Sequence, residues 1–168
     1  MEKATNIIIE CADPESAAGV ALMRALTAEL ANLYGDDGGI LAFSPADVRQ
    51  PRSVFLVAKN QVGPVGCGAL RPLTEEVAEV KRMYVAPTAR GHGIGRLLLH
   101  ELERYARLFK YASIKLETGI LQPEAIRLYE RSGYVRCECY GFYANDPRSV
   151  CFEKVLLKPP GKQQGLDG

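Results

Sequence analysis

Apolar residues recur along the chain with two different spacings, which predict helices in some segments and strands in others. A strand is expected over residues 6–11, and a helix should follow it, with Asp13-Pro14 supplying the N-cap and a first-turn proline. The helical positions are Leu22, Leu26, Leu30 and Leu33. The helix should end near Tyr34, because residues 35–39 are rich in glycine and aspartate.

The middle of the chain alternates between short apolar runs and turns before a second helix. Residues 40–52 are expected to be irregular, with one helical turn after Ser44-Pro45. Strands are predicted over residues 53–59, 65–71 and 74–85. A long helix follows, and its apolar face consists of Ile94, Leu98, Leu102, Tyr105 and Phe109.

The last part of the chain predicts a strand, a short helix and two closing strands. They are expected over residues 113–117, 122–133, 134–139 and 149–157. Hairpins come first and a helical crossover follows, so the order predicts a mixed, twisted α/β (α+β) sheet of about six to seven strands flanked by helices. Residues 1–157 are expected to form one domain, and the Pro/Gly/Gln-rich residues 158–168 a disordered tail.

Residues 90–96, Arg-Gly-His-Gly-Ile-Gly-Arg, stand between a predicted strand and a predicted helix. Backbone N–H groups at a helix start have no partner within the helix, and the helix dipole makes that end electropositive. Glycine lets the backbone approach a ligand closely. The loop therefore predicts a phosphate site, with a plain turn before a surface helix as the alternative. It fits neither the Gly-x-Gly-x-x-Gly pattern nor the Gly-Lys-Ser/Thr pattern of other nucleotide-binding loops.

Two motifs in the chain resemble those of a known family. Residues 90–95 fit the pattern Arg/Gln-x-x-Gly-x-Gly/Ala. Residues 122–134 have the spacing of Asn-x-x-Ala-x-x-Leu-Tyr-x-x-x-Gly-Phe, with Gln122 in place of asparagine and Tyr134 in place of phenylalanine. Over roughly residues 52–157 the chain resembles the GNAT superfamily of acyl-CoA-dependent N-acetyltransferases.

The resemblance implies the GNAT fold, in which two central strands splay apart and the pantetheine arm of the cofactor occupies the gap. The main chain of Met83, Tyr84 and Val85 would pair with that arm, and Gln122 would contact it. The pyrophosphate would be held by Arg90, Gly91, His92, Gly93, Ile94, Gly95 and Arg96. Acetyl-CoA would be the acyl donor, the acetyl group would pass directly to the acceptor, and no metal would be needed.

Acetyl transfer to an amine requires a base, because a lysine-like amine has a pKa near about 10.4. By the resemblance Glu79 is the candidate base, with a structural carboxylate paired with Lys81 or Arg82 as the alternative. If no bulge intervenes, strand alternation separates two sets of side chains. One face would carry Glu79, Lys81 and Met83, and the other Val80, Arg82 and Tyr84.

Tyr129 is the candidate acid, because a phenol with a pKa near about 10 is protonated at neutral pH and can donate to the leaving thiolate. A core tyrosine on a helix is the alternative. The N–H of Val85 is the expected oxyanion donor. A carboxylate-bearing acceptor would suit Arg71. The aromatic residues Tyr140, Phe142 and Tyr143 would either line the acceptor pocket or cover the last strand.

The expected reaction is acetylation of a primary amine on a small-molecule or amino-acid-like acceptor. Two alternatives remain open at this stage, namely a non-catalytic acyl-CoA sensor and an enzyme acting on protein or peptide amines. Variable loops build the acceptor pocket in such folds, so the sequence leaves the acceptor unidentified.

Composition bears on the partners of the protein, the state of its cysteines and its location. The chain has 168 residues and a formal net charge of +1, so neither nucleic acid nor a membrane is an expected partner. The five cysteines are expected to be reduced thiols, mostly buried, without zinc-ligand spacing. A cytoplasmic location is the default because the start of the chain lacks a signal-peptide core. Homodimerisation through the final strands is left open.

Overall fold

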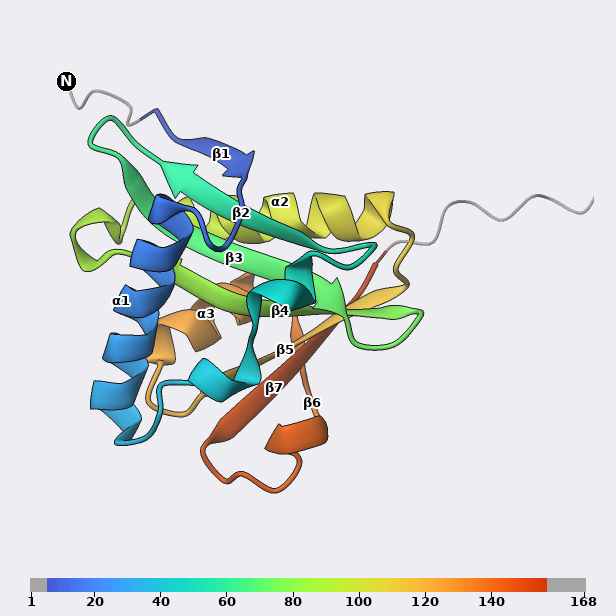
Figure 1. The fold of residues 1–168 in the computed structure, drawn as a ribbon. Coiled ribbons are helices and arrows are strands. Elements are labelled where there is room, and N and C mark those ends of the chain that lie inside the picture. Colours follow the sequence, from blue (N-terminus) through green and yellow to red (C-terminus); the bar gives the residue numbers. More distant parts are fainter. Residues whose placement is uncertain (1–5, 157–168) are drawn as a thin grey trace, which may run out of the picture.

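Seven strands form one sheet in the order β1-β2-β3-β4-β5-β7-β6, and the computed structural model describes residues 6–156 (Figure 1). The strands are β1 (Ile8–Cys11), β2 (Val54–Lys59), β3 (Pro64–Pro72), β4 (Val77–Val85), β5 (Ser113–Gly119), β6 (Val135–Cys137) and β7 (Ser149–Val155). The pair β4–β5 is parallel, and the other neighbouring strands within the described residues are antiparallel. The predicted mixed sheet is confirmed. The expected tail, residues 158–168, lies outside the described part of the chain.

Helices cover both faces of this sheet (Figure 1). They are α1 (Ala17–Tyr34), α2 (Ile94–Leu108) and α3 (Pro123–Arg131), with single helical turns η1 (Ile40–Ala42), η2 (Pro45–Val48), η3 (Pro87–Ala89) and η4 (Gly141–Tyr143). In β2, Leu56 packs on the side of α2, whereas Phe55 and Val57 pack on the side of α1. Burial on both faces explains why this strand is a continuous apolar run. No helix within residues 6–156 has both the length and the apolar character that a membrane crossing requires.

The start of α1 differs from the prediction. The helix begins at Ala17, and its N-cap is Ser16, whose hydroxyl accepts a hydrogen bond from the N–H of Gly19 at 3.2 Å. Asp13 is not the cap, because its carboxylate instead accepts from the N–H of Glu15 at 2.7 Å in the preceding turn. The predicted end is correct, since Gly35 has a left-handed φ of 69°.

The two parallel strands separate after four residue pairs. Val77–Val80 of β4 pairs with Ser113–Leu116 of β5, and β4 then continues to Val85 beside β3 alone. The N–H of Ala86 donates to the carbonyl of Val65 on β3 at 2.7 Å. Successive N–H groups of a strand point to opposite edges, so the N–H of Val85 faces the gap. The expected splay of the central strands is therefore confirmed.

A bulge in β4 overturns the simple alternation of its side chains. The register places Arg82 and Met83 together opposite Gly68, and Arg82 has a φ of 56°. An extra residue inverts the alternation beyond it. Met83 therefore packs on the side of α2, while Tyr84 joins the cluster beneath α1. Arg82 also turns toward α1, where its guanidinium donates to the carbonyls of Met23 and Gly38 at 3.2 Å each.

The expectation of five reduced thiols is wrong. Cys139 and Cys151 form a disulfide, with their Cα atoms 5.2 Å apart, and Cys11 is exposed rather than buried. The pairing of β6 with β7 places Cys137 opposite Cys151 in the sheet, and Cys139 follows two residues later. Only this strand pairing brings the two bonded sulfurs together, because they are twelve residues apart in sequence.

Candidate active site

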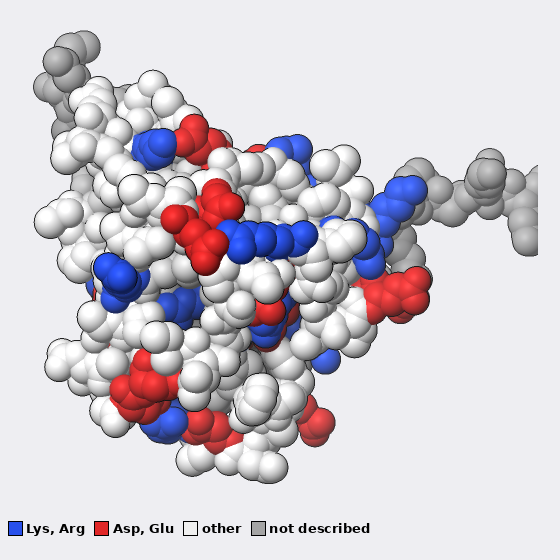
Figure 2. Space-filling model, in the orientation of Figure 1, with Lys and Arg blue, Asp and Glu red and all other residues white. Residues whose placement is uncertain are grey.

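A cavity of approximately 450 Å³ lies where β4 and β5 separate. Its wall includes the functional side chains Glu79, Lys81, Glu117, Gln122, Tyr129 and Tyr143. A second cavity of approximately 390 Å³ adjoins it, because Glu79, Lys81, Phe142 and Tyr143 line both. Figure 2 shows basic and acidic atoms together in the hollow at the centre of this face. We call the larger cavity the transfer cavity and the smaller one the side cavity.

The glycine loop opens α2 as predicted. Gly93 is the N-cap residue and makes no side-chain cap hydrogen bond. Gly91 and Gly93 have φ values of 83° and 77°, which other residues adopt with strain. The N-terminus of α2 is therefore uncapped by side chains and electropositive, as an anion site requires. His92 and Arg96 are exposed beside it, and the Nδ1 atom of His92 lies 3.2 Å from the carbonyl of Ala89.

The other residues expected to bind pyrophosphate have different surroundings. The guanidinium of Arg90 donates to both carboxylate oxygens of Glu29 on α1, at 2.9 and 2.8 Å, and to the carbonyl of Val85 at 2.8 Å. Ile94 is buried in the core, so only its main chain is available. A Cβ atom on Gly95 would lie 3.3 Å from a methyl of Leu128. Arg90 thus anchors the loop to α1, and Gly95 permits close packing against α3.

The gap between β4 and β5 leads from this helix start to the transfer cavity. Gln122 lines the cavity, and its side-chain oxygen accepts from the Tyr34 hydroxyl and from the N–H of Gly119, both at 3.1 Å. Tyr84 is buried against α1, which leaves its main chain for any ligand in the gap. Met83 and Gln122 therefore line the transfer cavity, and Tyr84 and Val85 follow Met83 along β4 beyond its pairing with β5.

Tyr129 of α3 is buried beside the rings of Tyr134 and Phe152 and lines the transfer cavity. Within residues 6–156 its hydroxyl makes no hydrogen bond to another side chain or to the backbone, and it is not fully enclosed. Burial, and then the charge of Glu117, raise the pKa of Tyr129 above its ordinary value. The phenol stays protonated at neutral pH and can donate into the cavity.

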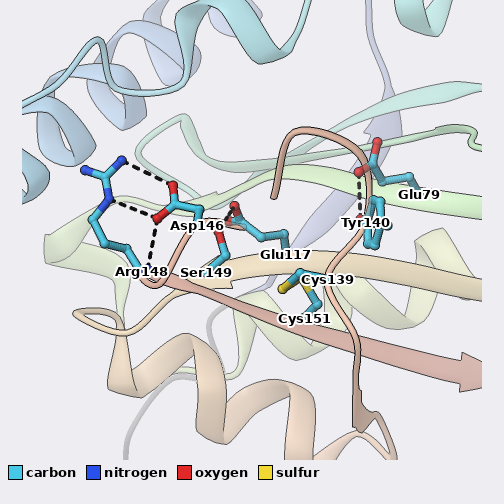
Figure 3. Close-up of a disulfide and its surroundings, with 8 residues drawn as sticks. All are labelled: Glu79, Glu117, Cys139, Tyr140, Asp146, Arg148, Ser149 and Cys151. Carbon is cyan, nitrogen blue, oxygen red and sulfur yellow. Dashed lines mark hydrogen bonds and ion pairs between the residues drawn. A yellow bond between two sulfur atoms is a disulfide. The ribbon is translucent and has the colours of Figure 1, made fainter. Parts of the chain in front are cut away.

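Glu79 also lines the cavity, but both of its carboxylate oxygens are occupied. Arg71 donates to Oε1 at 2.9 Å. The Tyr140 hydroxyl donates to Oε2 at 2.7 Å, as Figure 3 shows. Its side chain is only 2% exposed. The sequence anticipated a partner in Lys81 or Arg82, and the partners are instead Arg71 and Tyr140.

Glu117 is the cavity carboxylate that the sequence reasoning missed. It lies near the carboxyl end of β5, and Oε2 accepts from the Ser149 hydroxyl at 3.1 Å (Figure 3). Burial raises its pKa to about 7, and the Ser149 hydrogen bond and the Lys81 charge oppose that rise only in part. A base with this pKa is half ionised near neutral pH. The available sequence signal was its place near the carboxyl end of a parallel strand, where ligands bind.

Comparison with known proteins bears on this site. A family model described as the acetyltransferase (GNAT) family matches residues 19–134. The IAA acetyltransferase of Azospirillum brasilense is 39% identical over 152 residues, which cover 90% of this chain and 99% of that protein. These matches span the glycine loop, β4, β5 and α3.

Solved structures give the same picture of the fold. A provisionally named acyl-CoA N-acyltransferase from Klebsiella pneumoniae superposes with a TM-score of 0.76 at 35% identity, covering 90% of this chain and 98% of that one. A GNAT family acetyltransferase from Elizabethkingia anophelis has acetyl-CoA bound. It superposes with a TM-score of 0.68 at 20% identity, covering 90% of this chain and 99% of that one.

Proposed function

Because this chain belongs to the acetyltransferase (GNAT) family and is an N-acetyltransferase, we propose that it transfers acetyl from acetyl-CoA directly to a primary amine of a small, amino-acid-like acceptor. One observation carries the proposal. The Glu117 carboxyl, with a pKa of about 7, and the Tyr129 hydroxyl line one cavity at the end of the strand gap. A base and an acid thus face the same space.

The donor site follows from the uncapped start of α2. The main-chain amides of residues 91–96 would hold the pyrophosphate, with the exposed Arg96 and His92 as further donors. Arg90 would add its charge only after leaving Glu29, so its first role is to hold the loop against α1. The pantetheine arm would lie in the strand gap, beside Met83, Tyr84 and Val85 and close to Gln122.

The reaction then uses groups around the transfer cavity. Glu117 takes a proton from the acceptor ammonium, directly or through a water, and the free amine attacks the thioester carbonyl. The Val85 N–H stabilises the oxyanion. When the C–S bond breaks, the departing thiolate takes the proton of Tyr129. The new amide nitrogen gives up its second proton to the tyrosinate, directly or through a water, so the products are a neutral N-acetyl amine and free coenzyme A. Glu79, the base predicted from the sequence, remains the second candidate, although Arg71 and Tyr140 hold its oxygens.

A thiol-release assay with acetyl-CoA and a panel of amines tests this proposal. The panel should hold free amino acids, small amines, IAA because of the Azospirillum relative's name, and a peptide with a free N-terminus. We expect thiol release with an amino-acid-like member and a product whose mass has increased by one acetyl group. Tyr129→Phe should lower kcat by roughly 10²-fold or more and leave coenzyme A affinity unchanged. Release with the peptide alone would instead favour the protein-amine alternative.

A further inference from the structure

Lys81 lies on β4 at the boundary between the transfer cavity and the side cavity and lines both. Its Nζ atom donates to the Tyr143 hydroxyl at 2.5 Å and lies 5.1 Å from the centroid of that ring. Within residues 6–156 its ammonium makes no ion pair with a carboxylate. Burial lowers the pKa of Lys81, and the nearby Glu79 opposes that change. An anion placed against this ammonium would offset the loss of hydration.

The other cations on this face are already paired. Arg71 bonds Asp47 at 2.6 Å and Glu79 at 2.9 Å, so two carboxylates compensate its one charge. Arg82 donates to main-chain carbonyls of α1 and the following loop and to the Thr27 hydroxyl. Arg148, which also lines the transfer cavity, is paired with Asp36 and Asp146. Lys81 is therefore the cation on this face with capacity for an incoming anion.

Tyr143 adds a second donor at the same point. Its hydroxyl oxygen accepts the hydrogen bond from Lys81, which leaves the hydroxyl proton free to donate to a ligand. Burial raises the pKa of Tyr143, so this hydroxyl stays protonated at neutral pH. An ammonium and a phenol beside each other match the two oxygens of a carboxylate.

The surrounding charges orient a ligand that has both an amine and an acid. Glu117 lines only the transfer cavity, and Asp37 lies in the wall of the same cavity. Neither carboxylate makes an ion pair with another side chain within residues 6–156. These carboxylates favour an approaching ammonium group, whereas Lys81 lies at the boundary with the side cavity. A zwitterion would thus place its amine at Glu117 and its carboxylate at Lys81.

We propose that Lys81 and Tyr143 form a carboxylate subsite and that the acceptor is an α-amino acid with a free carboxylate. The inference depends on the proposed function for the acetylation of the acceptor's amino group. It does not depend on that function for the binding of the acceptor's carboxylate. Leu41 and Phe142 are 90% and 96% exposed and line both cavities, so they are placed to contact an apolar side chain of the acceptor.

The test compares an acid with its amide, for which leucine and phenylalanine are suitable parents. Calorimetry measures binding of N-acetylleucine and N-acetylleucinamide to the protein saturated with coenzyme A. We expect the acid to bind roughly 10- to 100-fold more tightly, because hydrogen bonds to charged groups are the strong ones. Lys81→Met should abolish that preference, and Tyr143→Phe should reduce it roughly three- to tenfold while keeping the ammonium. Lys59→Met is the matched control, since Lys59 on β2 is paired with Glu10 and lines neither cavity.

The outcomes separate this inference from the proposed function. The carboxylate subsite is overturned if the wild type binds the acid and the amide equally. It is also overturned if the wild type binds neither compound at millimolar concentration. It is also overturned if Lys81→Met folds, as circular dichroism reports, and still prefers the acid. A preference lost in Lys81→Met but kept in Lys59→Met supports the subsite. If that pattern appears but no amino acid releases thiol from acetyl-CoA, the subsite stands and the proposed reaction fails.

Discussion

A carboxyl group that loses its hydration becomes a proton acceptor suited to neutral pH, and Glu117 is in that situation. Burial raises its pKa to about 7, whereas Glu79 on the neighbouring strand β4 is held by Arg71 and Tyr140. Two carboxylates in one cavity thus differ in their partners. At the scale of single residues, this difference is the reason that we propose Glu117 as the base and Glu79 as a positioning residue.

The pH dependence of activity tests this assignment. The base works in its ionised form, so kcat/KM should fall roughly tenfold per pH unit below about pH 7. Glu117→Gln should lower kcat by roughly 10²-fold or more and remove this acid limb, with coenzyme A affinity unchanged. Glu75→Gln, in the exposed turn before β4, is the control and should keep the wild-type profile. A limb that survives in Glu117→Gln and disappears in Glu79→Gln would identify Glu79 as the base.

The segment between β6 and β7 lines both the transfer cavity and the side cavity. Its Tyr140 bonds Glu79 and its Tyr143 bonds Lys81, and the Cys139–Cys151 disulfide ties its start to β7. Figure 3 shows the disulfide beside the start of this segment, near Tyr140, and the Asp146–Arg148 pair near the end of the segment. The glycine loop lies on a different element, at the start of α2. We therefore expect acceptor binding and donor binding to depend on separate segments.

Removal of the disulfide should lower stability and weaken acceptor binding without changing coenzyme A binding. A disulfide that closes a loop of this length stabilises the folded state by about 3 kcal/mol, because it reduces the entropy of the unfolded chain. Cys139→Ser should therefore lower the free energy of unfolding by about that amount. We expect a higher KM for the acceptor and an unchanged coenzyme A affinity, measured by kinetics and calorimetry. Cys11→Ser, on β1, is the matched control. Free thiols at residues 139 and 151 in the oxidised protein, found by mass spectrometry, would contradict the pairing.

At the scale of the whole molecule, the sheet contains a gap where β4 and β5 separate. The strands β4 and β5 share only four residue pairs, and α2 and α3 flank the region where they part. A ligand with a diphosphate and a long arm would contact the helix start, both strands and α3 together. Binding to the folded state alone stabilises it by mass action.

Coenzyme A should therefore raise the melting temperature. At a free concentration about 100 times its Kd the stabilisation is about 2.7 kcal/mol, which corresponds to an upward shift of roughly 5–10 °C for a chain of this size. Pantetheine, which lacks the diphosphate, should give little shift at the same concentration. Differential scanning calorimetry measures both. A folded protein whose melting temperature is unmoved by millimolar coenzyme A would contradict a donor site at residues 90–96.

Short-range physics determined what the sequence could predict. Three sequence signals act within a few residues, namely the glycine positions, the apolar spacing of α2 and α3 and the apolar run of β2. The order of elements and the phosphate loop could therefore be predicted from the sequence. The splay and the Tyr129 hydroxyl in the cavity came from the family resemblance and agree with the structure.

Contacts between distant segments were decided only by the tertiary structure. The Ser16 cap, the bulge at Arg82 and the Cys139–Cys151 bond each depend on which of several competing partners lies within reach in space. The raised pKa of Glu117 depends on burial, which a strand acquires from its neighbours and not from its own residues. The sequence by itself therefore predicted the chemistry of the donor, whereas packing across the sheet decided the surroundings of Glu117 and Lys81, on which the proposed base and acceptor subsite depend.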